Sequence, residues 1–81
     1  MDSIQLHILS PEGTVVETEV SAVTLPGIQG PFMVLKDHAA LITALEKGSI
    51  VYRADGKEEV LPIAEGFVEV RDNKVVCCVE L

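Results

Sequence analysis

The chain has 81 residues, which is enough for one domain and too few for two. Hydrophobic residues make up 48% of it and aromatic residues only 4%, a composition that suits a compact core and excludes a disordered chain. Its 13 acidic residues against 6 basic ones give a net charge of −7, which argues against nucleic acid and anionic lipid as partners, because both need a cationic surface.

The first segment, residues 4–9, alternates between apolar and polar side chains. This pattern predicts a β-strand with Ile4, Leu6 and Ile8 on one face. A turn is expected at residues 10–13. Further strands rich in β-branched or apolar residues are predicted at residues 15–20, 22–25 and 32–35. Between the last two, residues 26–31 form an expected exposed loop, since two prolines lack donors and two glycines loosen the chain.

Residues 37–48 are ambiguous. Asp37 is a candidate N-cap, Gly48 a candidate C-terminal glycine, and the residues between them are good helix formers. Local propensity alone therefore favours a helix here.

The second half contains two predicted hairpins. Residues 49–53 and 58–63 flank Asp55-Gly56, which favours a type I′ turn. A turn of the same kind is expected at residues 71–73, between strands at residues 67–70 and 74–79. Short strands at this spacing predict an all-β sandwich or flattened barrel.

The two cysteines, Cys77 and Cys78, are adjacent in an apolar run. Neighbouring cysteines rarely form a disulfide, so we expect reduced and largely buried thiols in a reducing compartment. The apolar run from Val75 to Val79 is far shorter than the roughly 20 residues that span a bilayer. The acidic start, Met1-Asp2-Ser3, is not typical of a signal peptide.

No residues point to catalysis, a cofactor or a metal. Metal binding would draw on His7, His38 and the two cysteines, but adjacent cysteines on a strand point to opposite faces. An apolar setting also raises a thiol pKa, which is the wrong direction for a nucleophile. The vicinal acids Glu58-Glu59 do not converge on one face, and the Gly27-x-x-Gly30 spacing is too short for a phosphate loop.

Residues 27–48, GIQGPFMVLKDHAALITALEKG, closely resemble the signature of the F-type ATP synthase epsilon subunit family, G-x-x-G-x-[FL]-G-[IV]-[LY]-P-x-H-A-P-L-[LI]-T-x-[LI]-x-x-G. Residues 6–13 and 65–75 resemble the family's opening strand and its G-G-[FIV]-x-E-V-x-x-N-x-V segment. The chain departs from the pattern at Met33, Lys36, Ala40 and Glu65, which stand where the family has glycine or proline.

This resemblance implies that residues 1–81 form the family's N-terminal domain, a ten-stranded β-sandwich in which residues 42–45 are a strand. It implies a non-catalytic central-stalk (rotor) subunit that bridges the gamma subunit to the membrane c-ring and couples ion flow to ATP synthesis. By the same resemblance the c-ring contacts are Gln29, Gly30, Pro31 and Phe32, and the gamma contacts are Ser10, His38 and Thr43.

The expected location is the cytoplasmic face of a bacterial inner membrane, peripheral and without insertion. The family's inhibitory C-terminal helical hairpin has no counterpart in these residues, so we expect neither hairpin inhibition nor an ATP site. The residues leave two alternatives open, which are a generic β-sandwich interaction module and a small metal- or thiol-dependent enzyme.

Overall fold

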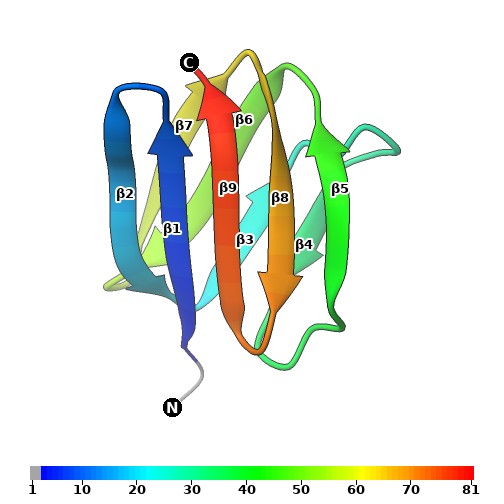
Figure 1. The fold of residues 1–81 in the computed structure, drawn as a ribbon. Coiled ribbons are helices and arrows are strands. Elements are labelled where there is room, and N and C mark those ends of the chain that lie inside the picture. The colour runs from blue at the N-terminus through cyan, green and yellow to red at the C-terminus, as the bar shows by residue number, and fades with distance from the viewer. Residues whose placement is uncertain (1–2) are drawn as a thin grey trace.

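The computed structural model describes residues 3–81 as two packed β-sheets (Figure 1). The acidic start at Met1 and Asp2 lies outside the described residues. The nine strands are β1 (Ile4–Ser10), β2 (Gly13–Val20), β3 (Ala22–Leu25), β4 (Phe32–Val34), β5 (Leu41–Leu45), β6 (Gly48–Ala54), β7 (Lys57–Ile63), β8 (Glu65–Arg71) and β9 (Lys74–Glu80). A five-stranded sheet has the order β2-β1-β9-β8-β5, and a four-stranded sheet the order β4-β3-β6-β7. The predicted β-sandwich is confirmed.

The strand count differs from the ten that the resemblance implied, because residues 3–81 contain nine. An isolated bridge between Gly27 and Leu45 adds one further pairing at the end of β5. It does not extend into a strand, since Pro26 has no N–H to donate and the chain turns at once, with the Gly30 N–H donating to the Gly27 carbonyl at 2.9 Å.

The ambiguous segment is a strand, so the helix favoured by local propensity is wrong. β5 pairs antiparallel with β8 from Leu41 opposite Val70 to Leu45 opposite Gly66, which completes one edge of the five-stranded sheet. Asp37 has a φ of 67° and forms part of a turn rather than a helix cap. Pairing with β8 and burial of Leu45 outweigh the local preference.

Both predicted hairpin turns have the backbone that type I′ requires. Asp55 and Gly56 have φ values of 53° and 73°, and Asp72 and Asn73 have values of 51° and 60°. These positive angles match the twist of the flanking strands and fix the register of each hairpin.

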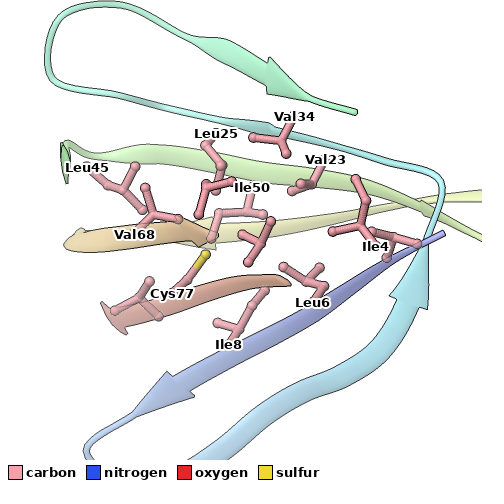
Figure 2. Close-up of a cluster of buried hydrophobic side chains, with 14 of the residues drawn as sticks. Ile4, Leu6, Ile8, Val23, Leu25, Val34, Leu45, Ile50, Val68 and Cys77 are labelled. Atoms are coloured by element: carbon pink, nitrogen blue, oxygen red, sulfur yellow. The ribbon is translucent and has the colours of Figure 1, made fainter. Parts of the chain in front are cut away.

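The core lies between the two sheets (Figure 2). Ile4, Leu6 and Ile8 of β1 are 1%, 1% and 0% exposed, as the alternation predicted. They pack with apolar side chains from the opposite sheet, and Cys77 is buried among them. Cys78 is half-buried, so the expectation that both thiols are largely buried holds only for Cys77. Successive residues of a strand face opposite sides, which turns Cys78 away from the core.

Candidate protein-interaction surfaces

The outward-facing side chains of the five-stranded sheet form the surface that we call the outer sheet face. The strand register aligns four of them in a transverse row, the apolar row, which consists of Leu9, Cys78, Phe67 and Ala44. Their neighbours Ile8, Cys77 and Val68 point into the core, so the members of the row point outward. Phe67 is 52% exposed, which is unusual for an aromatic side chain without a partner.

A groove of about 510 Å³ opens along this row, and Leu9, Cys78 and Phe67 all line it. Its lining comes from the ends of β1 and β9 and the start of β8, and comprises Leu9, Ser10, Pro11, Glu65, Gly66, Phe67, Cys78, Val79 and Glu80. Gly66 gives β8 its close approach to β9, because a Cβ atom there would collide with the Cys78 carbonyl oxygen and lie 3.0 Å from the Val79 Cα. The pairing of β8 with β9 therefore leaves no room for a side chain at position 66.

Acidic side chains surround the apolar row. On the strands of this sheet the exposed acids are Glu17, Glu19, Glu65, Glu69 and Glu80. The exposed bases Arg71 and Lys74 pair in register at the end opposite the groove. Arg71 also lies 3.9 Å from the Asp72 carboxylate, but such an exposed pair contributes little. The outer sheet face is thus apolar in its centre and mainly acidic around it.

Ser10 lies in the lining of the groove at the end of β1. Its hydroxyl accepts a hydrogen bond from the Glu12 N–H at 3.2 Å. The same hydroxyl lies 3.3 Å from Glu12 Oε1 and 3.4 Å from the Gly13 carbonyl, so it can donate to either. Ser10 therefore shapes the β1–β2 turn that borders the groove.

His38 lies at the other end of the molecule, in the loop between β4 and β5 (Figure 1). Its backbone N–H donates to the Leu35 carbonyl at 3.1 Å, and its ring Nδ1 lies 2.7 Å from the Ala39 carbonyl. Because a carbonyl only accepts, Nδ1 carries the proton in this bond. The neutral ring then has Nε2 as an acceptor for another group.

Thr43 is separated from both of these residues. It lies on β5 and lines a second groove, of about 480 Å³, which we call the loop groove. The other lining residues come from β5 and from the loop that joins β3 to β4, and are Gly27, Gln29, Gly30, Pro31, Phe32, Leu41 and Ile42. The structure therefore brings Thr43 together with all four predicted c-ring residues, whereas Ser10 and His38 lie at opposite ends of the five-stranded sheet.

The loop beside this groove is closely packed at its base and exposed at its tip. A Cβ atom on Gly27 would lie 2.8 Å from the Gly30 carbonyl and 2.9 Å from the Phe32 ring. Gly30 has a φ of 124°, a region that favours glycine. Gln29 and Pro31 are exposed, and Phe32 is half-buried against the core.

The described residues contain no group of three or more His, Cys, Asp or Glu side chains placed to hold a metal ion. Burial raises the pKa of the Cys77 thiol to about 12, with a smaller contribution from Cys78. This confirms the expected direction, and it leaves Cys77 as a protonated core residue. Within residues 3–81 no helix is long and apolar enough to cross a membrane.

The sequence interpretation missed the apolar row. Its signal was present in residues 67–70, where Val68 and Val70 alternate with Phe67 and Glu69. Once the valines are assigned to the core, Phe67 has to face outward. The alignment of Leu9 with Cys78 and Phe67 was not predictable, because it depends on the parallel pairing of β1 with β9.

A small β-sandwich with an exposed apolar row and two surface grooves has the features of a protein-interaction domain. A family model, the ATP synthase delta/epsilon chain β-sandwich domain, matches residues 3–80. The chain belongs to this family.

Curated relatives agree with the family match. The ATP synthase epsilon chain of Sulfurovum sp. (strain NBC37-1) is 41% identical over 81 residues, which cover 99% of this chain and 63% of the relative. The ATP synthase epsilon chain of Desulfitobacterium hafniense (strain DSM 10664 / DCB-2) is 47% identical over 70 residues, which cover 86% of this chain and 53% of the relative. The chain therefore spans a little over half the length of these two relatives.

Two solved structures share the fold. One chain of the Euglena gracilis mitochondrial ATP synthase, in a structure of OSCP, F1 and c-ring, matches 95% of this chain and 50% of its own length, with a TM-score of 0.89 and 24% identity. One chain of the Tetrahymena thermophila mitochondrial ATP synthase central stalk and c-ring matches 96% of this chain and 63% of its own length, with a TM-score of 0.81 and 15% identity. At these identities the likeness concerns the fold alone.

Proposed function

We propose that residues 1–81 are the β-sandwich domain of an epsilon subunit in the central stalk of an F-type ATP synthase. In this role the chain joins the gamma subunit to the c-ring, so that ion flow and ATP synthesis stay coupled. It acts as a non-catalytic part of the rotor at the cytoplasmic face of a bacterial inner membrane, held there by the complex. The family match over residues 3–80 and the two epsilon-chain relatives support this assignment.

The observation that carries the proposal is the presence of two separate exposed surfaces on one small domain. A subunit that bridges two partners needs two contact surfaces. The outer sheet face with its groove is one, and the loop groove at the edge of β5 is the other.

The outer sheet face is the proposed gamma contact. Phe67 at its centre has the size and exposure of an interface anchor, and aromatic anchors of this kind dominate binding energy. The surrounding acids fit a partner with an apolar patch among basic residues. Of the three gamma contacts that the resemblance implies, Ser10 and His38 lie at opposite ends of this sheet. Thr43 lies in the loop groove instead.

The tip of the loop, from Gln29 to Phe32, is the proposed c-ring contact. Gly27 lies close to the Gly30 carbonyl and the Phe32 ring, and Gln29, Gly30 and Pro31 are exposed beyond this contact. Hydrogen-bonded pairing joins all the strands within each sheet, which suits a domain that transmits load between two partners.

A titration of gamma binding tests the first contact. Phe67→Glu should weaken binding about 30-fold or more, because it places a charge at the centre of an apolar interface. Val60→Glu is the matched control, because Val60 is 57% exposed but lies on the four-stranded sheet. This variant should bind gamma with normal affinity. Equal affinities for the two variants would contradict the assignment.

Charged substitutions in the loop test the second contact. The pair Gln29→Glu and Pro31→Glu should weaken association with the membrane sector but leave gamma binding and the fold intact. Lys57→Glu, at the exposed start of β7, adds negative charge outside both surfaces and serves as the control. Membrane-sector binding that is unchanged by the loop variant would refute this part of the proposal.

A further inference from the structure

Asn73, in the β8–β9 turn, connects three segments that are distant in sequence. Its side-chain Oδ1 accepts a hydrogen bond from the Asp37 N–H at 2.6 Å, and its Nδ2 donates to Asp37 Oδ1 at 3.2 Å. Its backbone carbonyl accepts from the Gln5 N–H at 3.0 Å. The β8–β9 turn, the β4–β5 loop and the start of β1 therefore meet at one end of the sandwich (Figure 1).

The turn itself does not require the Asn73 side chain. The β6–β7 hairpin has the same kind of turn, and Gly56 occupies the corresponding position with a φ of 73°. Glycine adopts such angles more readily than asparagine does. The carboxamide of Asn73 is therefore best explained by its two bonds to Asp37, which lies 36 residues away.

Asp37 belongs to the loop that carries His38. This loop crosses from β4 of one sheet to β5 of the other, and Leu35, Lys36, Asp37, Ala39 and Ala40 are all exposed. Asp37 itself has a φ of 67°, which costs free energy for a residue with a side chain. The two hydrogen bonds to Asn73 fix this strained residue against the five-stranded sheet, and His38 is the next residue along the chain.

We propose that Asn73 is a positioning residue that, through Asp37, holds His38 in place at the end of the outer sheet face. This inference rests on the proposed function, because it gives the held loop a role in gamma binding. Asn73 does not need to touch gamma itself. It sets the place and orientation of the His38 ring.

A charge swap tests the inference. Asn73→Asp keeps the oxygen that accepts from the Asp37 N–H but replaces the donor with an oxygen that faces the Asp37 carboxylate. Gamma affinity should fall about five- to tenfold, the scale of one lost hydrogen bond. Adding Asp37→Asn places the side-chain donor on residue 37 and the acceptor on residue 73, so the hydrogen bond can form again in the opposite direction. The gamma affinity of the double variant should therefore recover to within about twofold of the original value. A double variant that binds as weakly as Asn73→Asp would overturn the inference.

Two further measurements distinguish a failure of this inference from a failure of the proposed function. Hydrogen exchange of the Asp37 amide in the isolated chain should accelerate in Asn73→Gly, because this variant removes the oxygen that accepts from the Asp37 N–H. His38→Ala should weaken gamma binding, and Asn73→Gly should add little to that loss. If His38→Ala binds normally, the proposed His38 contact is wrong. If His38→Ala is weakened but Asn73→Gly is not, the positioning role is wrong.

Discussion

At the scale of single residues, the two adjacent cysteines show that neighbouring side chains on a strand have different environments. Cys77 is 0% exposed in the core, whereas Cys78 lines the groove on the outer sheet face. Their chemical behaviour should differ accordingly, although their sequence contexts are nearly identical.

Thiol labelling of the native protein at pH 8 should therefore modify Cys78 and spare Cys77. With a pKa of about 12, the Cys77 thiol is ionised to only about one part in 10,000 at this pH, and it is shielded from reagents as well. Mass spectrometry after brief maleimide treatment should find one label per chain, and two labels after denaturation. Rapid labelling of both thiols in the folded protein would contradict the burial of Cys77.

The raised pKa of Cys77 also predicts a pH dependence of stability. Its folded value of about 12 lies above the ordinary value of 9.0, so the folded chain keeps a proton that the unfolded chain releases above pH 9. The contribution of this group is complete below pH 9 and is lost as the pH rises toward 12, by at most about 1.4 kcal/mol per pH unit. Urea unfolding at pH 8 to 10.5 should show a smaller decline for Cys77→Val than for Cys78→Val. Equal declines would exclude Cys77 as the source.

At the scale of elements, the pairing of β8 with β9 determines the shape of the groove. Gly66 stands opposite Val79 and has no room for a side chain. Gly66→Ala should lower the free energy of unfolding by about 1–3 kcal/mol, because the added methyl group forces the two strands apart. Chemical denaturation of this variant and of Glu65→Ala, its exposed neighbour, would measure the difference. A Gly66→Ala variant as stable as the control would show that the strands separate at no cost.

Elements with a local signal were predictable from the sequence, and elements fixed by distant partners were not. The alternation in β1 and the Asp-Gly turn of the β6–β7 hairpin depend on neighbouring residues, and the structure has them where expected. Residues 41–45 read as helix by propensity because their partner, β8, is more than 20 residues away. The resemblance supplied that strand, and the residues alone did not.

The candidate surfaces follow the same division. Residues 28–31 are exposed, and the predicted loop at residues 26–31 follows from its prolines and glycines. The apolar row and the bonds between Asn73 and Asp37 were not, since both depend on contacts between segments far apart in the chain. The burial of Cys78 was overestimated because the apolar run was given more weight than its alternation.

At the scale of the whole molecule, a domain of 81 residues has only a small free energy of unfolding. Domains of this size have a free energy of unfolding of roughly 4–12 kcal/mol in total. Ile50 is 0% exposed and lies in the centre of the core (Figure 2). Ile50→Ala should cost about 2–5 kcal/mol and lower the melting temperature strongly, or unfold the domain. Val60→Ala, on the exposed side of the neighbouring strand β7, should change the stability by about 0.5 kcal/mol or less. Comparable losses in circular dichroism melts would argue against a single core between the sheets.

We propose that two surfaces of one sandwich contact two different rotor components. Photo-cross-linking in the assembled ATP synthase tests it most directly, with a benzophenone amino acid placed in turn at positions 67, 29 and 60. We expect a cross-link from position 67 to the gamma subunit and a cross-link from position 29 to subunit c. Position 60 should cross-link to neither of these subunits. Cross-links from positions 67 and 29 to the same subunit, or a gamma cross-link from position 60 alone, would contradict it.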